Sequence, residues 1–430
     1  MLLKLTKSEI LKQKAQNLIP GLAHTFSKAP YSYVEGVYPA YVKSGLGSHL
    51  KDVDDNDYID YVLGLGPIIL GYSYPDVTDA IISSLKDGIT FSMPHYLEVE
   101  VGELICSVVK SAEMIKFTKT GSDAVTAAVR AARAITQREK IAYCGVGGIW
   151  HDWFIVATSR DQGVPKFNRD LLKIFQYNKI ESLEQIFEQN KGEIAAVCIE
   201  PIVFESPTGD FLHKVESLAH ENGALLIFDE VVTGFRMSLG GAQEYYGIKP
   251  DLSCFGKAIA NGMPLGAVVG KQEFMKIFHE IFYSTTFAGD IPSLAASKAT
   301  INVLKEKKVN NYLWNKGTEL KSAFQKILQQ LDLPIDIIGL PHRLGFSIQN
   351  ISDLDPFLIK SILFQECVQR GIIFGPGSIL HTFSHDSDDT KKTVDVFADA
   401  SEFLKKAIDS NEPLKYLRGK KMKPVLKFPV

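Results

Sequence analysis

The 430-residue sequence has only five cysteines, and no two of them form a C-x-x-C pair. Their scatter provides neither a disulfide framework nor a zinc site, so we interpret them as reduced core residues. The sequence also lacks an apolar run long enough to span a bilayer. Its N-terminal residues form an amphipathic, lysine-bearing pattern without the features of a signal peptide. We therefore expect a cytoplasmic protein with no metal site and no membrane contact.

The sequence also lacks an excess of charge of either sign. The net charge is only -3, with 45% hydrophobic and 23% charged residues, as in ordinary globular proteins. A balance of this kind gives no reason to expect a nucleic-acid partner. The length of 430 residues exceeds one simple core and allows two or three domains.

Short apolar runs alternate with helical patterns through the middle of the chain. Such strands, apolar on both faces and separated by helices, predict an α/β fold with a mostly parallel sheet flanked by helices. The candidate strands are residues 114–118, 140–144, 194–202, 224–232 and 266–270. In sheets of this type ligands bind beyond the carboxyl ends of the strands, which directs attention to the residues that follow each strand.

The pattern predicts three parts of the chain. Residues 1–65 form an N-terminal arm with a hairpin and belong to a small domain, and residues 66–300 form the large domain. Residues 301–430 form the rest of a small α+β domain, ending in a basic stretch from Pro413 that contains no acidic residue. We expect that stretch to be a solvated extension or a subunit-docking extension, and the alternative is docking of a polyanionic partner.

A helix start follows the first strand candidate. Thr120, Gly121 and Ser122 form a tight turn there, and a helix start offers free backbone N–H groups that suit a phosphate. Gly121 allows close backbone approach. The alternative is a simple helix start, with Ser122 or Asp123 as the N-cap.

Two charged residues also follow apolar strands. Asp229 ends a strongly apolar run, where a carboxylate is costly unless it meets a cation or a donor. Lys257 lies among small and apolar residues in FGKAIANGMPLG. Taken singly, these residues are equally compatible with a loop carboxylate and a partly exposed loop lysine.

The combination is more specific than its parts. A phosphate-bearing pyridine cofactor needs a phosphate cradle, an acid at the ring nitrogen and a lysine that forms an imine. An apolar site lowers the pKa of a lysine towards the neutral form that can attack an aldehyde. Trp150 and His151, after another strand, provide aromatic groups for stacking. In this order the residues predict a pyridoxal 5'-phosphate (PLP) enzyme.

The stretch IFDEVVTGFRMSLGGAQEYYGIKPDLSCFGKAIANGMPLGAVVG resembles the core of the class III aminotransferases, which are fold type I PLP enzymes. Within that family the resemblance is greatest to the glutamate-1-semialdehyde 2,1-aminomutases, and it covers nearly the whole chain. The resemblance implies a PLP-dependent enzyme with a large cofactor-binding domain and a smaller α+β domain.

The resemblance also implies a role for each matching residue. Lys257 would hold the cofactor as an imine, and Asp229 would bind the pyridinium nitrogen. Val231 would pack on one ring face and Trp150, next to His151, on the other. Gly121 and Ser122 would hold the phosphate through their N–H groups. Thr286 would reach the phosphate of a neighbouring subunit, which implies a homodimer with shared active sites.

The sequence departs from the aminomutase pattern where the substrate binds. Thr25 and Lys28 occupy positions of a serine and an arginine, and lysine lacks the bidentate guanidinium fork that a carboxylate prefers. Further departures from the aminomutase pattern are Leu65 for tryptophan, Glu205 for asparagine and Leu380 for glutamate. The glycine- and serine-rich lid is shortened to residues 158–167.

These departures favour an aminotransferase that moves an amino group from a separate donor to an aldehyde or keto acceptor. Lys28, His24 and the basic tail fit an anionic acceptor, for example a sugar derivative. The alternatives are the aminomutase reaction, other PLP chemistry such as decarboxylation, and a non-catalytic relative of the fold. The sequence identifies neither the donor nor the acceptor.

Overall fold

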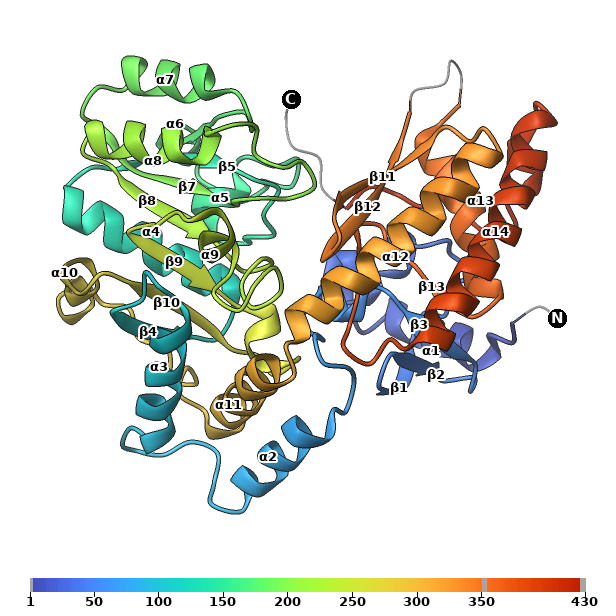
Figure 1. The fold of residues 1–430 in the computed structure, drawn as a ribbon, viewed down its shortest axis with the longest axis horizontal. Coiled ribbons are helices and arrows are strands. Elements are labelled where there is room, and N and C mark those ends of the chain that lie inside the picture. Colours follow the sequence, from blue (N-terminus) through green and yellow to red (C-terminus); the bar gives the residue numbers. More distant parts are fainter. Residues whose placement is uncertain (1–2, 350–353, 426–430) are drawn as a thin grey trace. The chain divides into compact units, whose positions relative to one another are not determined.

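The structure is a computed structural model that describes residues 3–349 and 354–425. It divides into two compact units (Figure 1). Unit 1 contains the chain up to Tyr74 and from Asn311 to Val425, and unit 2 runs from Pro75 to Asn310. The sequence placed these divisions at 65/66 and 300/301. No helix among the described residues is long and apolar enough to cross a membrane.

Unit 2 is built on a seven-stranded sheet with the order β4-β10-β9-β8-β7-β5-β6. The strands are β4 (Met114–Thr118), β5 (Lys140–Cys144), β6 (Leu172–Ile174), β7 (Ile194–Ile199), β8 (Leu225–Asp229), β9 (Leu252–Phe255) and β10 (Gly266–Gly270). Strand β10 runs antiparallel to both of its neighbours, and the other pairs are parallel. The predicted mostly parallel α/β sheet is confirmed.

Successive side chains of the central strands point to opposite faces of the sheet, and helices cover both faces. In β8, Leu225 and Ile227 pack into the cluster that contains the buried alanines of α4 (Gly121–Thr136). Leu226 and Phe228 point to the opposite face, against α7 (Ile180–Gln189) and α8 (Phe211–Glu221). Because both faces are buried, the strands read as continuous apolar runs.

The remaining helices of unit 2 are shorter or lie towards its ends (Figure 1). They are α2 (Pro75–Leu85), α3 (Tyr96–Val108), α5 (Asp152–Ile155), α6 (Asn168–Leu171), α9 (Ala242–Tyr246), α10 (Gln272–Met275) and α11 (Ile291–Glu306). The 3-10 helices are η5 (Lys257–Ala260) and η6 (Lys276–His279).

Unit 1 contains two small sheets and three long helices. The four-stranded sheet joins β1 (Val42–Leu46), β2 (His49–Asp52), β3 (Asp57–Asp60) and β13 (Ile372–Ile373); the three-stranded sheet joins β11 (Ile335–Leu340), β12 (Arg343–Ile348) and β14 (Ser378–Leu380). The α-helices are α1 (Thr6–Gln16), α12 (Val309–Gln330), α13 (Pro356–Gln369) and α14 (Ser387–Asp409). Short 3-10 helices are η1 (Pro20–Leu22), η2 (Phe26–Lys28), η3 (Pro30–Ser32), η4 (Leu63–Leu65) and η7 (Pro413–Tyr416).

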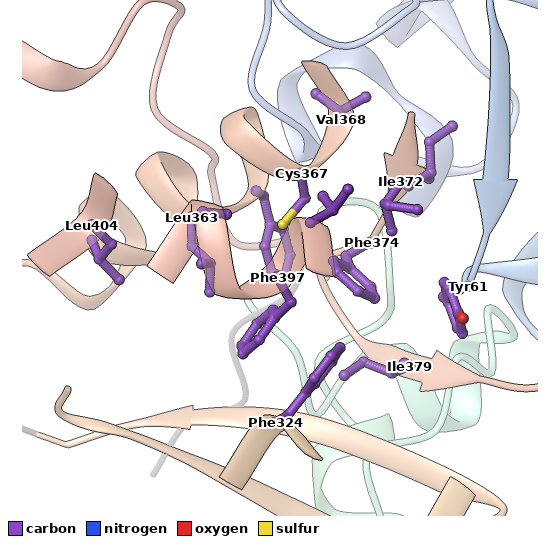
Figure 2. Packing of buried hydrophobic residues seen from close by; sticks show 14 of the residues in the cluster. Tyr61, Phe324, Leu363, Cys367, Val368, Ile372, Phe374, Ile379, Phe397 and Leu404 are labelled. Carbon is purple, nitrogen blue, oxygen red and sulfur yellow. The ribbon is translucent and has the colours of Figure 1, made fainter. Parts of the chain in front are cut away.

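The core of unit 1 is aromatic. Figure 2 shows Phe324 of α12 beside Phe397 of α14, and their ring centroids are 3.8 Å apart in a stacked arrangement. Phe374, after β13, meets the Phe324 ring edge-on. Strand β13 pairs in parallel with β3, so this core holds together segments more than 300 residues apart in the sequence.

The basic C-terminal stretch packs against its own unit as far as Val425, which corrects the prediction of a solvated extension, whereas docking on a second subunit stays a prediction. Arg418 forms an ion pair with the buried carboxylate of Glu366 on α13, and the Met422 N–H donates to Ser361 Oγ at 3.0 Å. Lys420 pairs with Glu35 in a short bridge that also includes backbone pairing. These positive charges therefore form ion pairs with acidic residues of unit 1, which the basic sequence of the stretch alone did not reveal.

Candidate active site

Lys257 follows β9 of unit 2 after a single glycine. Its φ angle is +43°, in the left-handed region that side-chain-bearing residues rarely adopt. The residue is half-buried, and the Ala258, Ile259 and Ala260 side chains after it are fully buried. A strained backbone at a lysine among buried apolar residues is typical of functional positions.

Asp229 is the last residue of β8, the strand next to β9. Its side chain is 6% exposed, and it accepts a hydrogen bond of 3.1 Å from the Val231 N–H. Burial, together with the nearby negative charge of Glu200, raises the pKa of Asp229 to about 7. The Val231 N–H and the positive charge of Lys257 oppose that rise. A buried acid of this kind is one whose charged form a cation would stabilise strongly.

Glu200 is a residue of this edge that the sequence analysis missed. It directly follows β7, and the register pairs Ile199 with Phe228, so Glu200 stands beside Asp229 at the same sheet edge. It is 4% exposed, and its Oε1 accepts a hydrogen bond of 2.8 Å from the Val146 N–H. The sequence does contain the pattern that could have identified Glu200, because this acid directly follows a fully apolar strand, much as Asp229 ends one.

The turn before α4 lies in close contact with the residues after β8 and β9. A Cβ atom added to Gly121 would lie 2.6 Å from Val231 Cγ1, and one added to Gly256 would lie 3.3 Å from Gly121 Cα. Only glycine therefore fits at position 121 without displacing Val231. The close approach brings Gly121, Val231 and the residue before Lys257 together, and their shared role in one cofactor site stays a prediction.

The start of α4 is capped by Thr120, not by Ser122 or Asp123. Thr120 Oγ1 accepts from the Asp123 N–H at 3.1 Å, and Asp123 Oδ2 accepts from the Thr120 N–H at 2.8 Å. This capping box leaves the N–H groups of Gly121 and Ser122 without a hydrogen-bond partner among the described residues. Free N–H groups at a helix start are a ready anion site.

Trp150 and His151 lie on the loop that follows β5. His151 Nε2 is 3.3 Å from Asp123 Oδ1 in the first turn of α4. Burial alone would raise the pKa of Asp123, but the contacts with His151 and Thr120 hold that pKa below its ordinary value. The Trp150 ring is 63% exposed and its centroid is 4.0 Å from that of His151. Ser122 Oγ donates to the Gly148 carbonyl at 3.3 Å, so two contacts fix this loop to α4.

The other predicted residues lie elsewhere. Thr286 is in an exposed segment of unit 2, and no hydrogen bond joins it to the Gly121 turn within the described part of one chain. Glu205 is exposed and accepts from Asn178 Nδ2 at 2.8 Å, which holds the loop after β7. Thr25 and Lys28 belong to unit 1, where both line a cavity of that unit.

The residues at the sheet edge of unit 2 fit PLP. The Gly121 turn provides a cradle that a Cβ atom would fill, with free N–H groups for a phosphate. Asp229 is a buried acid that a protonated pyridine nitrogen would stabilise, and Lys257 is the nearby amine. Together the fold and this donor set define a fold type I PLP-dependent enzyme.

The comparisons with known proteins agree with this class. The model of the family "Aminotransferase class-III" matches residues 31–399, so the chain belongs to the class III aminotransferases, which use PLP. The chain is 37% identical over 348 residues to 3-aminobutyryl-CoA aminotransferase of Cloacimonas acidaminovorans, covering 79% of this chain and 83% of that protein.

Two further relatives extend over more of the chain. Glutamate-1-semialdehyde 2,1-aminomutase of Alkaliphilus oremlandii is 34% identical over 429 residues, covering 93% of this chain and 99% of that protein. The PLP internal aldimine form of the FumI protein of Sphingopyxis sp. MTA144 superposes with a TM-score of 0.88. It is 26% identical and covers 95% of this chain and 99% of its own.

Proposed function

We propose that this class III enzyme transfers an amino group from one molecule to the aldehyde or keto group of another. Lys257 and Asp229 are its catalytic residues, and Gly121, Ser122, Trp150, His151 and Val231 hold the cofactor. The support for the site is the packing of Gly121, Val231 and Gly256 beside the buried Asp229. PLP, when bound, withdraws electrons from the carbon that carries nitrogen and makes its proton removable.

The residues of this chain bind and orient the cofactor and move the proton. Asp229 keeps the pyridine nitrogen protonated, because its buried carboxylate is stable only beside a cation. The free N–H groups of Gly121 and Ser122 bind the phosphate, and Val231 supports one face of the ring. The Lys257 Nζ atom takes the proton from the reacting carbon and returns it.

The short segment after His151 is the observation that favours transfer between molecules. Residues 158–167, in place of a glycine- and serine-rich lid, are held by contacts of their own. Asp161 forms an ion pair with Arg169 at the start of α6, and the Val164 N–H donates to the Asp161 carbonyl at 3.1 Å. An aminomutase must retain its intermediate while nitrogen changes carbon, and a mobile lid serves that purpose. A short segment held in this way suits an enzyme that releases its first product.

The name of one relative supports amino transfer between two molecules. Cloacimonas 3-aminobutyryl-CoA aminotransferase is 37% identical to this chain, and its name describes an amino transfer. The competing function is that of the aminomutases, favoured by 34% identity over 93% of the chain. Two of the substitutions that oppose it have structural roles here, since Glu205 holds Asn178 and Leu380 is 4% exposed.

A homodimer is part of this proposal, with Thr286 reaching the phosphate site of the partner subunit. Unit 2 exposes large apolar side chains that a second copy would cover. They are Ile82 and Leu85 on α2, Ile89, Phe91 and Met93 in the segment that follows, and Tyr96 and Val99 on α3, with Phe282 and Phe287 on either side of Thr286. Exposed apolar groups in such number are typical of an interaction surface. Light scattering should give twice the chain mass of 47.7 kDa.

The function is tested by supplying one substrate at a time. The loaded enzyme, given glutamate-1-semialdehyde and no amino donor, should form little 5-aminolevulinate. With a donor alone, the absorbance of the bound cofactor should change once, and a carbonyl acceptor should restore it. Efficient 5-aminolevulinate formation without a donor would favour the aminomutase reaction instead.

A further inference from the structure

Unit 2 contains a cavity of about 400 Å³ whose walls come from α4 and from the segment after β5. This volume is in the range of small-molecule sites. The lining side chains that could bind a ligand are Arg130 and Arg133 on α4, Trp150 and Asp152 after β5, and Asn168 at the start of α6. Charged and aromatic groups of this kind suit a polar ligand with a planar part.

The two arginines lie far along α4 from the turn that is assigned to the PLP phosphate. Arg130 and Arg133 come nine and twelve residues after Gly121, which corresponds to about 14 and 18 Å in a helix that rises about 1.5 Å per residue. Neither guanidinium is therefore placed to share a phosphate held at the start of the helix. The cavity is a site of its own, although Trp150 and His151 border it as well as the proposed PLP site.

Arg130 and Arg133 are positive charges with no acid paired to them. They stand three residues apart on one helix face, where like charges repel each other. Arg130 Nη1 donates to the Phe282 carbonyl at 2.9 Å, and its guanidinium lies 5.7 Å from the centroid of the Tyr283 ring. Arg133 Nε donates to the Glu139 carbonyl at 2.7 Å. Among the described residues neither guanidinium forms an ion pair with a carboxylate.

Burial makes Arg133 the stronger indication of an anion site. Its side chain is half-buried, and burial lowers the pKa of its guanidinium, which the charge of Glu139 opposes. Because an arginine stays charged in proteins, its removal from water must be offset by hydrogen bonds or by an anion. After the single bond to the Glu139 carbonyl, N–H groups of this guanidinium remain without a partner in the described part of the chain. Unpaired N–H groups of a guanidinium match the oxygens of a phosphate.

Asp152 and Trp150 indicate which kind of phosphate fits. Asp152 is exposed at the start of α5, and its carboxylate has neither a hydrogen bond nor an ion pair within the described residues. A carboxylate repels an inorganic anion, but it accepts hydrogen bonds from the hydroxyl groups of a ribose. The Trp150 ring, which is 63% exposed, offers a flat face on which a nucleic-acid base can stack. Guanidinium, carboxylate and indole groups in one cavity therefore correspond to the phosphate, sugar and base of a nucleotide.

We propose that this cavity binds a nucleoside 5'-phosphate, with the phosphate at Arg130 and Arg133, the ribose at Asp152 and the base on Trp150. An indole ring has two faces, so the base and the cofactor ring can both contact Trp150. An occupied cavity should therefore change the absorbance of bound PLP and the rate of amino transfer, a step that rests on the proposed function. Binding of the nucleotide itself needs only unit 2.

Isothermal titration of the PLP-loaded enzyme with adenosine 5'-phosphate (AMP), ribose 5-phosphate and adenosine tests the binding. Loaded enzyme is used so that the phosphate site at Gly121 is already filled. AMP should bind about tenfold more tightly than either fragment, because it alone presents both a base and a phosphate. No binding of AMP, or equal affinities for AMP and ribose 5-phosphate, would overturn the proposal.

The arginines are tested by comparing two ligands on one variant. Arg133→Ala should weaken AMP about tenfold or more and leave adenosine unchanged, because only a charged phosphate contact is lost. Arg133→Lys keeps the charge and should recover part of the AMP affinity. Lys179→Ala, on an exposed lysine of unit 2 outside the cavity, is the control and should alter neither ligand. Equal losses for AMP and adenosine would contradict a phosphate contact at Arg133.

The ribose contact has a test of its own. The wild-type enzyme should bind AMP about fivefold or more tightly than 2'-deoxy-AMP, because a hydrogen bond to a charged group is lost with the hydroxyl. Asp152→Ala should bring this ratio close to one. A ratio that stays the same in the variant would contradict the assignment of Asp152.

Spectra and turnover assays test the link to the cofactor. Saturating AMP should shift the absorbance of bound PLP. In turnover, competition between AMP and the carbonyl acceptor would show that the acceptor carries the nucleotide, and a change in kcat would show a free effector. AMP that binds without any of these effects would overturn the link. Because the titrations measure binding alone, a failure of the amino-transfer proposal leaves their result intact.

Discussion

The proposed PLP site of unit 2 and the cavity of unit 1 are built in different ways. The PLP site uses the ends of neighbouring strands, so Glu200, Asp229 and Lys257 each follow an apolar run. The cavity uses the N-terminal arm, the turn after β3 and Ile373, with leucines held at positive φ. A short local pattern in the sequence therefore predicts the proposed PLP site, whereas the cavity of unit 1 depends on how segments that are distant in the sequence pack together.

The largest effect is expected when the Lys257 side chain of unit 2 is replaced. Lys257→Ala and Lys257→Arg should lower kcat more than about a thousandfold, because the lysine both holds the cofactor and moves the proton. The unfolding temperature should stay close to that of the wild type. Lys249→Ala, on an exposed lysine of the same unit, should retain full activity. Activity in either Lys257 variant within tenfold of wild type would remove the catalytic assignment.

Asp229→Asn should come next, with a loss of about a hundredfold or more in kcat. The amide cannot stabilise a positive ring nitrogen, so the cofactor loses its electron-withdrawing form. Steady-state kinetics with any accepted donor provides the measurement. Asp229→Glu keeps the charge and should recover part of the rate. If the Asn variant turned over like the wild type, the acid would have no part in the chemistry.

Gly121→Ala tests whether the turn cradles a phosphate. The added Cβ would lie 2.6 Å from Val231 Cγ1, so the turn must shift, and overpacking of this kind costs about 1–3 kcal/mol. We expect PLP affinity to fall by about tenfold or more in a spectroscopic titration. Gly148→Ala, with no atom within 4 Å of the added Cβ, is the control and should bind PLP normally. Equal affinities for both variants would argue against the cradle.

The remaining predicted effects concern the pH dependence of stability and have opposite signs in the two units. In the cofactor-free protein the pKa of Asp229 is raised to about 7, mainly by burial and by Glu200. The folded state then holds a proton that the unfolded state loses near pH 4. Stability should therefore fall between about pH 4 and 7, by up to roughly 4 kcal/mol. Asp229→Asn should remove this fall in urea denaturation, and an unchanged pH profile would contradict the burial of the acid.

In unit 1 burial lowers the pKa of His385 to about 4, with a further contribution from His49 against the opposing charge of Asp389. His385 stacks on Tyr61 with ring centroids 4.4 Å apart. The unfolded state takes up a proton near pH 6.5 and the folded state does so only near pH 4. Stability should therefore fall as the pH drops through that window, by up to roughly 3 kcal/mol. His385→Phe should flatten the acid limb, and retention of that limb would assign it to other groups.

Much of the sheet in unit 2 could be predicted from the sequence. The runs at 114–118, 140–144 and 266–270 are strands with those bounds, because a strand buried on both faces needs apolar residues without interruption. Asp229 and Lys257 could be found for the same reason, since a charge that ends such a run is conspicuous. Their roles in PLP binding stay predictions.

Other features depend on contacts that the sequence does not display. Thr120 caps α4 although Ser122 and Asp123 are equally good capping residues, and only the backbone decides between them. The basic tail meets Glu366 and Glu35 of its own unit, which are far away in sequence. Helix α11 belongs to unit 2 and extends past the predicted division at 300/301, because its buried face packs with α2 and α3.

The most direct test of the account locates the cofactor. Reduction of the PLP-loaded protein with borohydride fixes the pyridoxyl group on the residue that holds it, and peptide mapping by mass spectrometry then identifies that residue. We expect one labelled peptide per chain, modified at Lys257. A pyridoxyl group on any other lysine, or on none, would contradict it.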